Sequence, residues 1–428
     1  MENAQAGIHL RPLSWPRDWG PEMLSLISRD KAFDCLVLDR SAPTVAAAAK
    51  QSGLHVIQQQ GETLAVPSGV TLISDGVWAR VVRAREDPTS TEAGPTGLPW
   101  IDSNGWRIRL AHAQSPGKLP WVRFSFPPNE VVRGAAYQIA IADCEANGGR
   151  WVVQLDRELS TGLAKGNIAA QQTWKAIAQA VAFYRETPSF PELPGNGARM
   201  GVLSDFAGDN EFMGHEFLNL IAREYVPVRI FMKTGAPPPL GSLRLVIYLD
   251  AQPLPPAWAQ ALAAFVHAGG TLVTARTADP KLGKAMAPVA GLEYDLRSAG
   301  KGRVAVSTED FDDPWRVAAD AHVLLGRAND LIRHANAGAM NITYTASADG
   351  RHARLQLVSY SHQRALNPVT LTLYNRYRTA LFRSLTSPAV KEVPVAVEYG
   401  RTAVYLPHFA ICGTVDLHAG KEEDHVDR

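Results

Sequence analysis

Residues 255–275 read PPAWAQALAAFVHAGGTLVTA, and this stretch indicates the fold of the middle of the chain. Its first part, residues 256–267, has the apolar spacing of an amphipathic helix. Gly269 and Gly270 follow, and glycine is the usual residue at the end of a helix. The short apolar run 271–275 then predicts a strand. A helix that leads directly into a strand is the repeating unit of a parallel sheet with helical crossovers.

The same alternation extends to both sides of this stretch and predicts a Rossmann-like α/β domain at residues 199–335. Further strands are expected at residues 200–204, 227–232 and 243–249, and further helices at residues 211–225 and 315–336.

Residues 1–187 also alternate between strand and helix, and a linker rich in proline and glycine, residues 188–198, ends this region. Six strands suit either a doubly wound sheet or a shortened β/α barrel. Polar residues at the C-terminal end of nearly every run, where a barrel collects its active site, favour the shortened barrel. The expected strands are residues 8–10, 35–39, 55–58, 70–74, 121–126 and 151–156, and the expected helices are residues 21–29, 44–52, 132–147 and 169–185.

Residues 341–418 have a different texture, in which apolar and polar residues alternate between turn signals. This period of two predicts a small antiparallel β domain. The last residues, 419–428, are highly charged and are expected to be disordered.

The composition limits the classes of function. The chain has 428 residues, of which 46% are hydrophobic, and this length and composition are enough for two or three domains with proper cores. Its net charge is +1. Its apolar runs are too short to span a bilayer, and it has no basic stripe for nucleic acid. Cys35, Cys144 and Cys412 lie far apart in apolar stretches and are expected to be buried free thiols.

The first residues, MENAQAG, have no signal-peptide pattern, although Ala4-Gln5-Ala6 is similar to the end of a cleaved signal. Both a cytoplasmic location and a secreted or periplasmic one therefore remain open.

The order of these regions resembles the β-galactosidase type of glycoside hydrolase, whose second domain is a glutamine-amidotransferase-like trimerisation domain. The resemblance is carried by AQALAAFVHAGGTLV (259–273) in the middle of the chain and by three segments near its end. These are LQLVSYSH (355–362), VTLTLYNRYRTALF (369–382) and TAVYLPHF (402–409). It implies a saccharide substrate, no cofactor, and a homo-oligomer that forms through the second domain.

The sequence also departs from that family. The N-terminal region is roughly half the length of a full eight-stranded barrel. The family uses two glutamates at strand ends, the first in an Asn-Glu pair, and here the only such pair in the region is Asn129-Glu130. A glutaminase needs a reactive cysteine, and none of the cysteines lies between residues 199 and 335. We therefore expect the amidotransferase-like domain to be a scaffold or an oligomerisation module.

Glycoside hydrolysis needs two carboxyl groups, one as the acid and the other as the nucleophile or base. Asp156, which closes the run WVVQLD, is the main candidate, and Glu130, Asp39 and Asp75 are candidates for its partner. Each has a structural alternative. Asp156 is placed to cap the next turn, Glu130 to open a helix, and Asp39 and Asp75 to pair with arginines.

The stretch GLPWIDSNGWRIR, residues 97–109, predicts a saccharide-facing loop over the open end of the barrel. Tryptophan stacks on the flat faces of sugars, and the polar residues between the two indoles pair with hydroxyl groups. In the alternative reading, Asp102 or Ser103 only caps the following helix. The expected substrate-binding residues are Trp100, Asp102, Asn104, Trp106, His9, Arg11, Trp15 and Trp78.

These observations leave three hypotheses. The first is a glycoside hydrolase that acts on a β-linked saccharide through Asp156 and a second carboxylate. The second is a non-catalytic carbohydrate-binding or assembly protein derived from such an enzyme. The third is a different enzyme built on the acids of LSDFAGDNEF, residues 203–212, although these acids more simply open a helix. No metal-binding spacing is present, so no metal or cofactor is expected.

Overall fold

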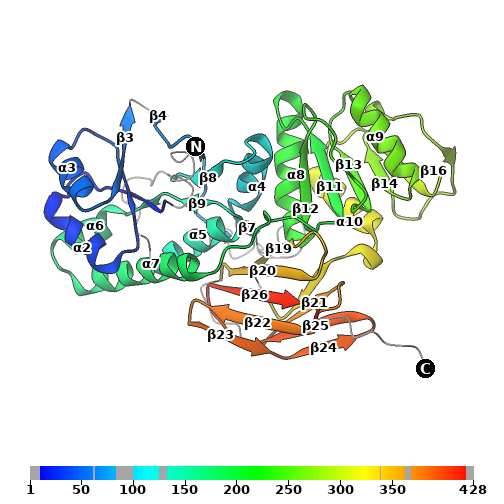
Figure 1. The fold of residues 1–428 in the computed structure, drawn as a ribbon. Helices are drawn as coiled ribbons and strands as arrows, with labels where there is room; N and C mark the ends of the chain where they lie inside the picture. The colour runs from blue at the N-terminus through cyan, green and yellow to red at the C-terminus, as the bar shows by residue number, and fades with distance from the viewer. Residues whose placement is uncertain are drawn as a thin grey trace, which may run out of the picture.

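The computed structural model describes residues 10–60, 63–82, 100–124, 132, 134–337, 339–361 and 368–420. Figure 1 shows three sections, with the blue and cyan N-terminal section beside the green central section, and the orange and red C-terminal section below them. We call residues 10–187 the N-terminal section, residues 199–331 the central section and residues 332–420 the C-terminal section. The chain thus has a mixed α/β fold with several sheets.

The N-terminal section contains parallel strands whose order follows the chain. One sheet has the order β10-β1-β2-β3-β4 and another the order β5-β8-β9. Residues 150–154 join the two sheets, because β9 pairs with β8 and β10 pairs with β1. Among the described residues, β3 and β5 are not paired with each other. The strands are β1 (Pro12–Ser14), β2 (Cys35–Leu38), β3 (His55–Gln60), β4 (Thr63–Leu64), β5 (Val70–Ile73), β8 (Leu119–Val122), β9 (Arg150–Trp151) and β10 (Val153–Gln154).

A separate hairpin and several helices complete this section. Strands β6 (Arg80–Val82) and β7 (Trp100–Asp102) form an antiparallel pair. The longest helix, α7, packs against α5, and its N-terminus is capped by Asn167, whose side chain accepts bonds from two backbone amides. The helices are α2 (Leu24–Asp30), α3 (Pro43–Gln51), α4 (Gly105–Gln114), α5 (Gly134–Ala146), α6 (Arg157–Ala164) and α7 (Ile168–Glu186).

The first strand lies further along the chain than expected. The sequence predicted it at residues 8–10, but β1 begins at Pro12, and residues 1–9 lie outside the described part of the chain. Proline is tolerated as the first residue of a strand, so Pro12 does not prevent pairing with β2 and β10. As a consequence, Arg11 lies at the start of the strand, at the end opposite to the one expected.

The central section is built on a seven-stranded sheet in the order β12-β11-β13-β14-β17-β16-β15. Its first five strands are parallel, and three of them are completely buried, as expected of a sheet with helices on both faces. Helices α8 and α10 share one apolar cluster, and α9 belongs to another on the opposite face. The elements are β11 (Met200–Ser204), α8 (Glu211–Arg223), β12 (Val228–Met232), β13 (Leu245–Tyr248), α9 (Pro256–His267), β14 (Thr271–Thr274), β15 (Lys284–Ala285), β16 (Tyr294–Ala299), β17 (Gly302–Ser307) and α10 (Pro314–Leu325).

The helix expected at residues 315–336 is shorter than predicted, since α10 ends at Leu325. Gly326 follows with a φ of 76°, a conformation that favours glycine and ends the helix. Residues beyond it form β18 (Ile332–Ala335), which pairs with a strand of the C-terminal section. The helical spacing of apolar residues in the sequence continues past the end of α10 and into β18, which is why the predicted helix was too long.

The C-terminal section has two antiparallel sheets, β18-β21-β25-β24 and β19-β20-β26-β22-β23, which share one apolar core. Most of its strands lie where the alternation placed them, whereas β23 and β26 were not predicted. The remaining strands are β19 (Met340–Ala346), β20 (His352–Ser359), β21 (Val369–Leu373), β22 (Thr379–Ser384), β23 (Ser387–Val393), β24 (Val395–Glu398), β25 (Arg401–Leu406) and β26 (Cys412–His418). The charged end, residues 421–428, lies outside the described residues.

The N-terminal and C-terminal sections share buried contacts. The hydroxyl group of Tyr360 donates a 2.6 Å hydrogen bond to Asp143 on α5, and both residues have no exposed surface. Five residues of the C-terminal section belong to the apolar cluster of the N-terminal section. They are Val358, Tyr360, Leu385, Ile411 and Cys412.

The three cysteines are buried free thiols, as expected. Burial raises the pKa of Cys35 to about 12, so that thiol stays protonated at neutral pH. Within the described ranges, no helix is long and apolar enough to cross a membrane.

Candidate functional site

The C-terminal ends of the parallel strands in the N-terminal section lie along one edge, because neighbouring parallel strands end on the same side. We call this edge the mouth. Six of the described strands end in, or are followed by, a polar or aromatic residue there. These residues are Trp15 and Arg17 after β1, Asp39 after β2, Gln59 in β3, Asp75 and Trp78 after β5, Arg123 after β8 and Asp156 after β10.

Asp156 lies at the mouth with its carboxylate held in a fixed orientation. One oxygen, Oδ1, accepts a 2.9 Å bond from the backbone amide of Leu159 and so caps α6. The other, Oδ2, accepts a 2.9 Å bond from the hydroxyl of Tyr137, which in turn accepts a 2.8 Å bond from the amide of Asp156. The residue is 2% exposed. Both the capping role and the strand-end position foreseen from the sequence are thus present.

A cavity of about 200 Å³ opens beside this carboxylate. Asp156 and Glu158 both line it, together with residues of α6 and α7 and with Val132. Burial raises the pKa of Tyr137, and the negative charge of Asp156 adds to this effect. The tyrosine therefore remains a hydrogen-bond donor to Asp156 across the neutral range. Two acidic residues therefore line one small volume at the strand end.

Aromatic rings form the buried wall behind Asp156. Trp78 is 7% exposed, and its ring contacts Tyr137 edge-on at a centroid distance of 5.3 Å and Trp151 at 4.6 Å. Trp15 is also buried and donates from Nε1 to the carbonyl of Trp19. Trp15 and Trp78, both expected to bind substrate, thus lie in the core around the mouth, and this packing orients Tyr137.

Two of the other carboxylate candidates form contacts with arginines and not with Asp156. Asp39 forms a 2.7 Å ion pair with Arg17. Asp75 has a side chain that is 75% exposed, and it lies 3.5 Å from Arg107. Both match the alternative that the sequence left open, an arginine partner. Glu130 lies outside the described residues.

Residues 100–106 do not form the open loop that the sequence predicted. Trp100 to Asp102 are strand β7, and α4 begins three residues later. Asp102 lies 3.8 Å from Arg80 across the hairpin. The expected cap is also different, because neither Asp102 nor Ser103 is the N-cap residue: Asn104 occupies this position without a side-chain capping bond.

Asn104 and Trp106 have structural partners inside the protein. Asn104 has no exposed surface. Its side-chain oxygen accepts a hydrogen bond from the backbone amide of Val77, and its side-chain nitrogen donates one to the carbonyl of Val77, each at 2.8 Å. The same nitrogen donates to Asp143, so both amide hydrogens are used. Trp106 packs against the ring of His215 on α8 at 4.8 Å, which joins the N-terminal and central sections. The side chain of Trp100 lies outside the described part of the structure.

Arg11 does not lie at the mouth, because it precedes β1. Its backbone amide donates to Asp34, and its guanidinium lies 3.8 Å from Glu145. Burial lowers the pKa of Arg11, and Glu145 partly opposes that effect. The register of the first strand explains this correction. His9 lies outside the described residues.

Tyr137 and Arg123 make side-chain contacts at the mouth and were not among the candidates. Tyr137 orients Asp156 from α5, and Arg123 donates from Nη2 to Gln59 at 3.1 Å. That bond connects β8 and β3, which are not paired through their backbones. Arg123 directly follows the buried strand β8, so its strand-end position was the available signal.

Comparison with solved structures shows what this arrangement is similar to. An α-L-fucosidase, isoenzyme 2 from Paenibacillus thiaminolyticus, matches with a TM-score of 0.52 and 13% identity, over 94% of this chain and 80% of that chain. The chain has a glycoside hydrolase-type fold. No protein-family model matches the sequence, and no curated protein sequence is similar to it.

Two β-galactosidases match the same fold less closely. The enzyme from Bacillus circulans sp. alkalophilus has a TM-score of 0.49 and 10% identity, over 87% of this chain and 63% of that chain. The enzyme from Rahnella sp. R3 has a TM-score of 0.44 and 13% identity, over 73% of this chain and 57% of that chain. The chain therefore spans less than two thirds of the length of either β-galactosidase.

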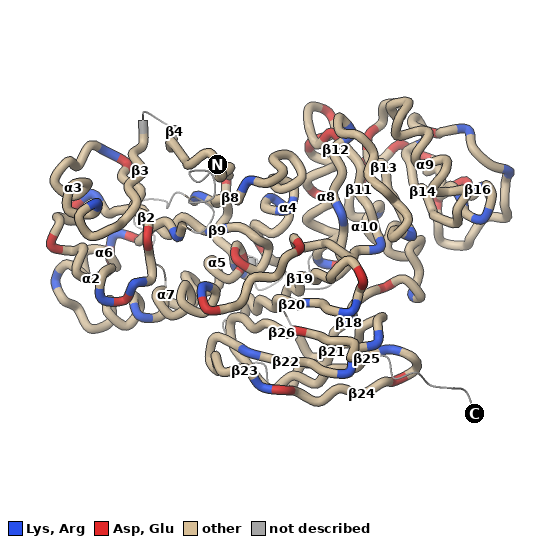
Figure 2. Tube along the Cα trace, in the orientation of Figure 1, with Lys and Arg blue, Asp and Glu red and all other residues tan. Residues whose placement is uncertain are grey.

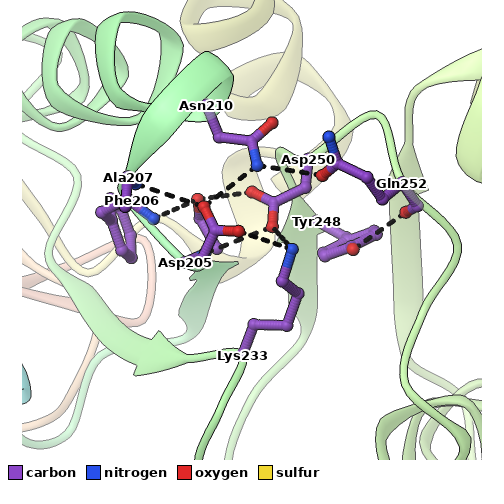
Figure 3. Close-up of polar contacts among 9 residues, drawn as sticks. Asp205, Phe206, Ala207, Asn210, Lys233, Tyr248, Asp250 and Gln252 are labelled. Carbon is purple, nitrogen blue, oxygen red and sulfur yellow. Dashed lines mark hydrogen bonds and ion pairs between the residues drawn. The ribbon is translucent and has the colours of Figure 1, made fainter.

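A second polar cluster in this glycoside hydrolase-type fold lies at the C-terminal edge of the central sheet (Figure 3). Lys233, just after β12, forms ion pairs with Asp205 at 2.7 Å and with Asp250 at 2.5 Å. Asp250 is fully buried and also accepts a bond from Ser204. Asn210 bridges Asp205 and Gln252, which follow two neighbouring strands of the sheet.

The ion pairs of this cluster stabilise the charged forms of Lys233 and Asp205. Burial alone would lower the pKa of Lys233, but its hydrogen bonds to Asp205 and Asp250 outweigh burial and raise it. Burial likewise opposes, without reversing, the lowering of the pKa of Asp205 by Lys233 and Asn210. A lysine that stays protonated is a poor nucleophile or base. Asp205, the first acid of residues 203–212, thus serves an ion-pair network at the edge of the sheet, whereas Asp209 and Glu211 lie in the first turns of helices.

The remaining charge is dispersed. Figure 2 shows Lys and Arg interspersed with Asp and Glu along the traces of all three sections. Among the residues that the structure describes, no group of three or more His, Cys, Asp or Glu side chains is placed to hold a metal ion.

Proposed function

We propose that the chain is a glycoside hydrolase-like protein that acts on a β-linked saccharide at the mouth of the N-terminal section. The observation that carries this proposal is Asp156, which lies at the end of β10 beside a cavity of about 200 Å³ that Glu158 also lines. Strand ends of this kind are where β/α barrels hold their catalytic groups.

We further propose that the N-terminal section is a shortened β/α barrel. Its strand order supports this, since β1, β2 and β3 follow one another and β10 returns to pair with β1. The side-chain bond between Arg123 and Gln59 spans the place where pairing is interrupted. The central section, amidotransferase-like in this reading, acts as a scaffold or oligomerisation module, because Lys233 and its carboxylates are fully engaged with one another.

In the proposed reaction, Asp156 is one of the two carboxyl groups, and Glu158 or Glu130 is the other. Tyr137 is a positioning residue, since its hydroxyl group bonds both the side chain and the amide of Asp156. The acid and the nucleophile or base differ in protonation, so the reaction requires one of these carboxyl groups to be protonated and the other ionised.

A second candidate is a non-catalytic saccharide-binding protein. One observation favours it: both oxygens of Asp156 already accept hydrogen bonds within the protein, and the residue is 2% exposed. A carboxylate whose bonds are made internally serves the cap of α6 equally well without any reaction.

The variant Asp156→Asn separates these possibilities. Asparagine caps helices as well as aspartate does, so the fold of α6 is retained while the charge is removed. We expect hydrolysis of aryl β-glycosides or polysaccharides by the wild-type chain and a loss of at least about 100-fold in the variant. Asp295→Asn, on the exposed face of β16, is the matched control and should keep full activity.

Unchanged hydrolysis in Asp156→Asn would refute the catalytic assignment. If the wild-type chain binds an oligosaccharide in calorimetry without releasing reducing sugar, the non-catalytic candidate is correct. Circular dichroism and thermal unfolding of each variant show whether a loss of activity comes from a loss of fold.

A further inference from the structure

A larger cavity, of about 350 Å³, lies away from the mouth, between the N-terminal and central sections. Helix α4 forms one side, four consecutive residues of the edge strand β12 form the other, and residues 192–196 of the linker close it. We call it the linker pocket. Its volume lies within the usual range for small-molecule sites. It shares no lining residue with the cavity beside Asp156.

Two arginines line the linker pocket without an ion-pair partner. Arg229 projects from β12 with its guanidinium 5.2 Å from the centre of the Phe231 ring. Arg109 projects from α4 and donates from Nε to the carbonyl of Gly105. Within the described ranges, no carboxylate lies within ion-pair distance of either guanidinium. A partly buried guanidinium normally has an anionic partner, because loss of water disfavours its charge.

Burial disfavours the charged form of both guanidinium groups. It lowers the pKa of Arg229, and it lowers the pKa of Arg109 to about 10 although Asp143 opposes this from a distance. Both arginines remain charged at neutral pH. An anion between them would restore the interactions that burial has removed.

The linker pocket also holds a hydrogen-bond acceptor without a donor. Oε2 of Glu192 is buried and has no hydrogen-bond partner within the described structure. His112 does not supply a donor to it, because its Nε2 lies 3.0 Å from the carbonyl of Gly148 and so carries the ring hydrogen. Burial lowers the pKa of His112, which keeps the ring neutral. Unsatisfied buried carboxylate oxygens are rare in folded proteins.

The charges that line the linker pocket therefore do not balance. Arg109 and Arg229 contribute two positive charges, Glu192 contributes one negative charge, and His112 is neutral. One negative charge on a ligand would balance them. A carboxylate matches the planar donors of guanidinium groups, and a hydroxyl group beside it would donate to Glu192.

We propose that the linker pocket binds a small ligand that carries one carboxylate and neighbouring hydroxyl groups, of the class of acidic monosaccharides. The carboxylate lies between Arg109 and Arg229, and a hydroxyl group donates to Oε2 of Glu192. This site is separate from the mouth and does not rest on the function proposed there.

Calorimetric titration of the full chain at pH 7 tests this site with three probes. Sodium D-glucuronate carries both features, D-glucose lacks the charge, and acetate lacks the hydroxyl groups. We expect saturable binding of one glucuronate per chain, with glucose and acetate each weaker by at least about tenfold. The absence of saturable glucuronate binding, or equal affinity for glucose, would overturn the proposal.

Variants locate the binding. Arg229→Met should weaken glucuronate binding by about tenfold or more, since a charged hydrogen bond is removed. Glu192→Gln, which keeps the shape of the side chain, should weaken it several-fold. Arg276→Met, an exposed arginine after β14, is the matched control and should bind as the wild type does. Unchanged binding in Arg229→Met would refute the site.

Two further measurements distinguish the linker pocket from the mouth and from misfolding. Asp156→Asn should leave glucuronate binding unchanged, and a loss there would assign the binding to the mouth and overturn the proposal. Without ligand, Arg229→Met should unfold at the same temperature as the wild type or at a higher one, because it removes a charge without a partner. If Arg229→Met fails to fold, Glu192→Gln alone decides, and unchanged affinity in that variant refutes the site.

Discussion

Removing the charge of Lys233 should destabilise the central section by about 3–5 kcal/mol, the usual effect of deleting one partner of a buried ion pair. The substitution Lys233→Met keeps an unbranched side chain one atom shorter and removes the ammonium group. Asp250 would then be left fully buried with only two donors, the hydroxyl of Ser204 at 2.5 Å and the amide of Asp205 at 3.2 Å. Asp205, with a side chain 27% exposed, regains water and contributes less. We therefore expect a value near the lower end, about 3 kcal/mol.

The free energy of unfolding is measured by urea titration, followed by hydrogen exchange of the peptides that contain β11, β12 and β13. Tryptophan fluorescence provides a local signal, because Nε1 of Trp258 donates to Gly235, two residues after Lys233. Lys281→Met is the matched control. Lys281 also pairs with an aspartate, at 3.0 Å, but its side chain is 83% exposed, and its loss should change stability by less than about 0.5 kcal/mol.

The double variant Lys233→Met/Asp250→Asn tests the physical cause. If the loss comes from an unpaired buried carboxylate, neutralising Asp250 should recover about 1–3 kcal/mol of it. A loss of less than about 1 kcal/mol in Lys233→Met, or no recovery in the double variant, would refute the reasoning. It would mean that water or a rearranged side chain satisfies Asp250 at little cost.

Two further outcomes are expected. Hydrogen bonds to Asp330 and Glu224 raise the pKa of His322 to about 9, so its stabilisation is complete below about pH 6.5 and is lost as the pH rises through 9. The free energy of unfolding should fall by up to about 3 kcal/mol over this interval, and His322→Gln should flatten the profile; an unchanged profile would contradict the assignment. A Cβ atom on Gly302 would lie 2.2 Å from a main-chain oxygen, so Gly302→Ala should destabilise the protein by at least about 1–3 kcal/mol. Gly241→Ala is the control, because Gly241 has open space around it and its substitution should not destabilise the protein. Equal melting temperatures of the two variants would show that the backbone at Gly302 adjusts freely.

The sequence predicted the parallel strands of the N-terminal section well, because each is a short apolar run with polar residues at its end. It misplaced the first of them, because the strand begins at Pro12 and the prediction followed the apolar residues that precede it. The sequence-based helix at residues 315–336 extended past Gly326, because the apolar spacing gave no sign of the change from helix to strand. Local pattern thus identified most of the elements, but it missed whole strands such as β23 and β26 and misplaced these two boundaries.

The candidate site was less predictable. Asp156 was proposed as a catalytic residue from its strand-end position, and its orientation depends on Tyr137, 19 residues earlier on another element. Trp106 was interpreted as a platform for a sugar, and its ring instead packs on His215, which is more than 100 residues away in the chain. The linker pocket combines α4, β12 and the linker, so no contiguous stretch of sequence reveals it. Contacts between distant segments are set by tertiary packing, which local periodicity does not encode.

The bond between Tyr360 and Asp143 bears on how such a chain can be shortened or exchanged in evolution. Asp143 is buried on α5 and accepts a hydrogen bond from a hydroxyl group supplied more than 200 residues later, and five buried residues of the C-terminal section belong to the apolar cluster of the N-terminal section. A gene fragment that encodes only the first 187 residues would leave a buried carboxylate short of a donor and a large apolar face open to water. The two ends of the chain are therefore expected to be inherited together.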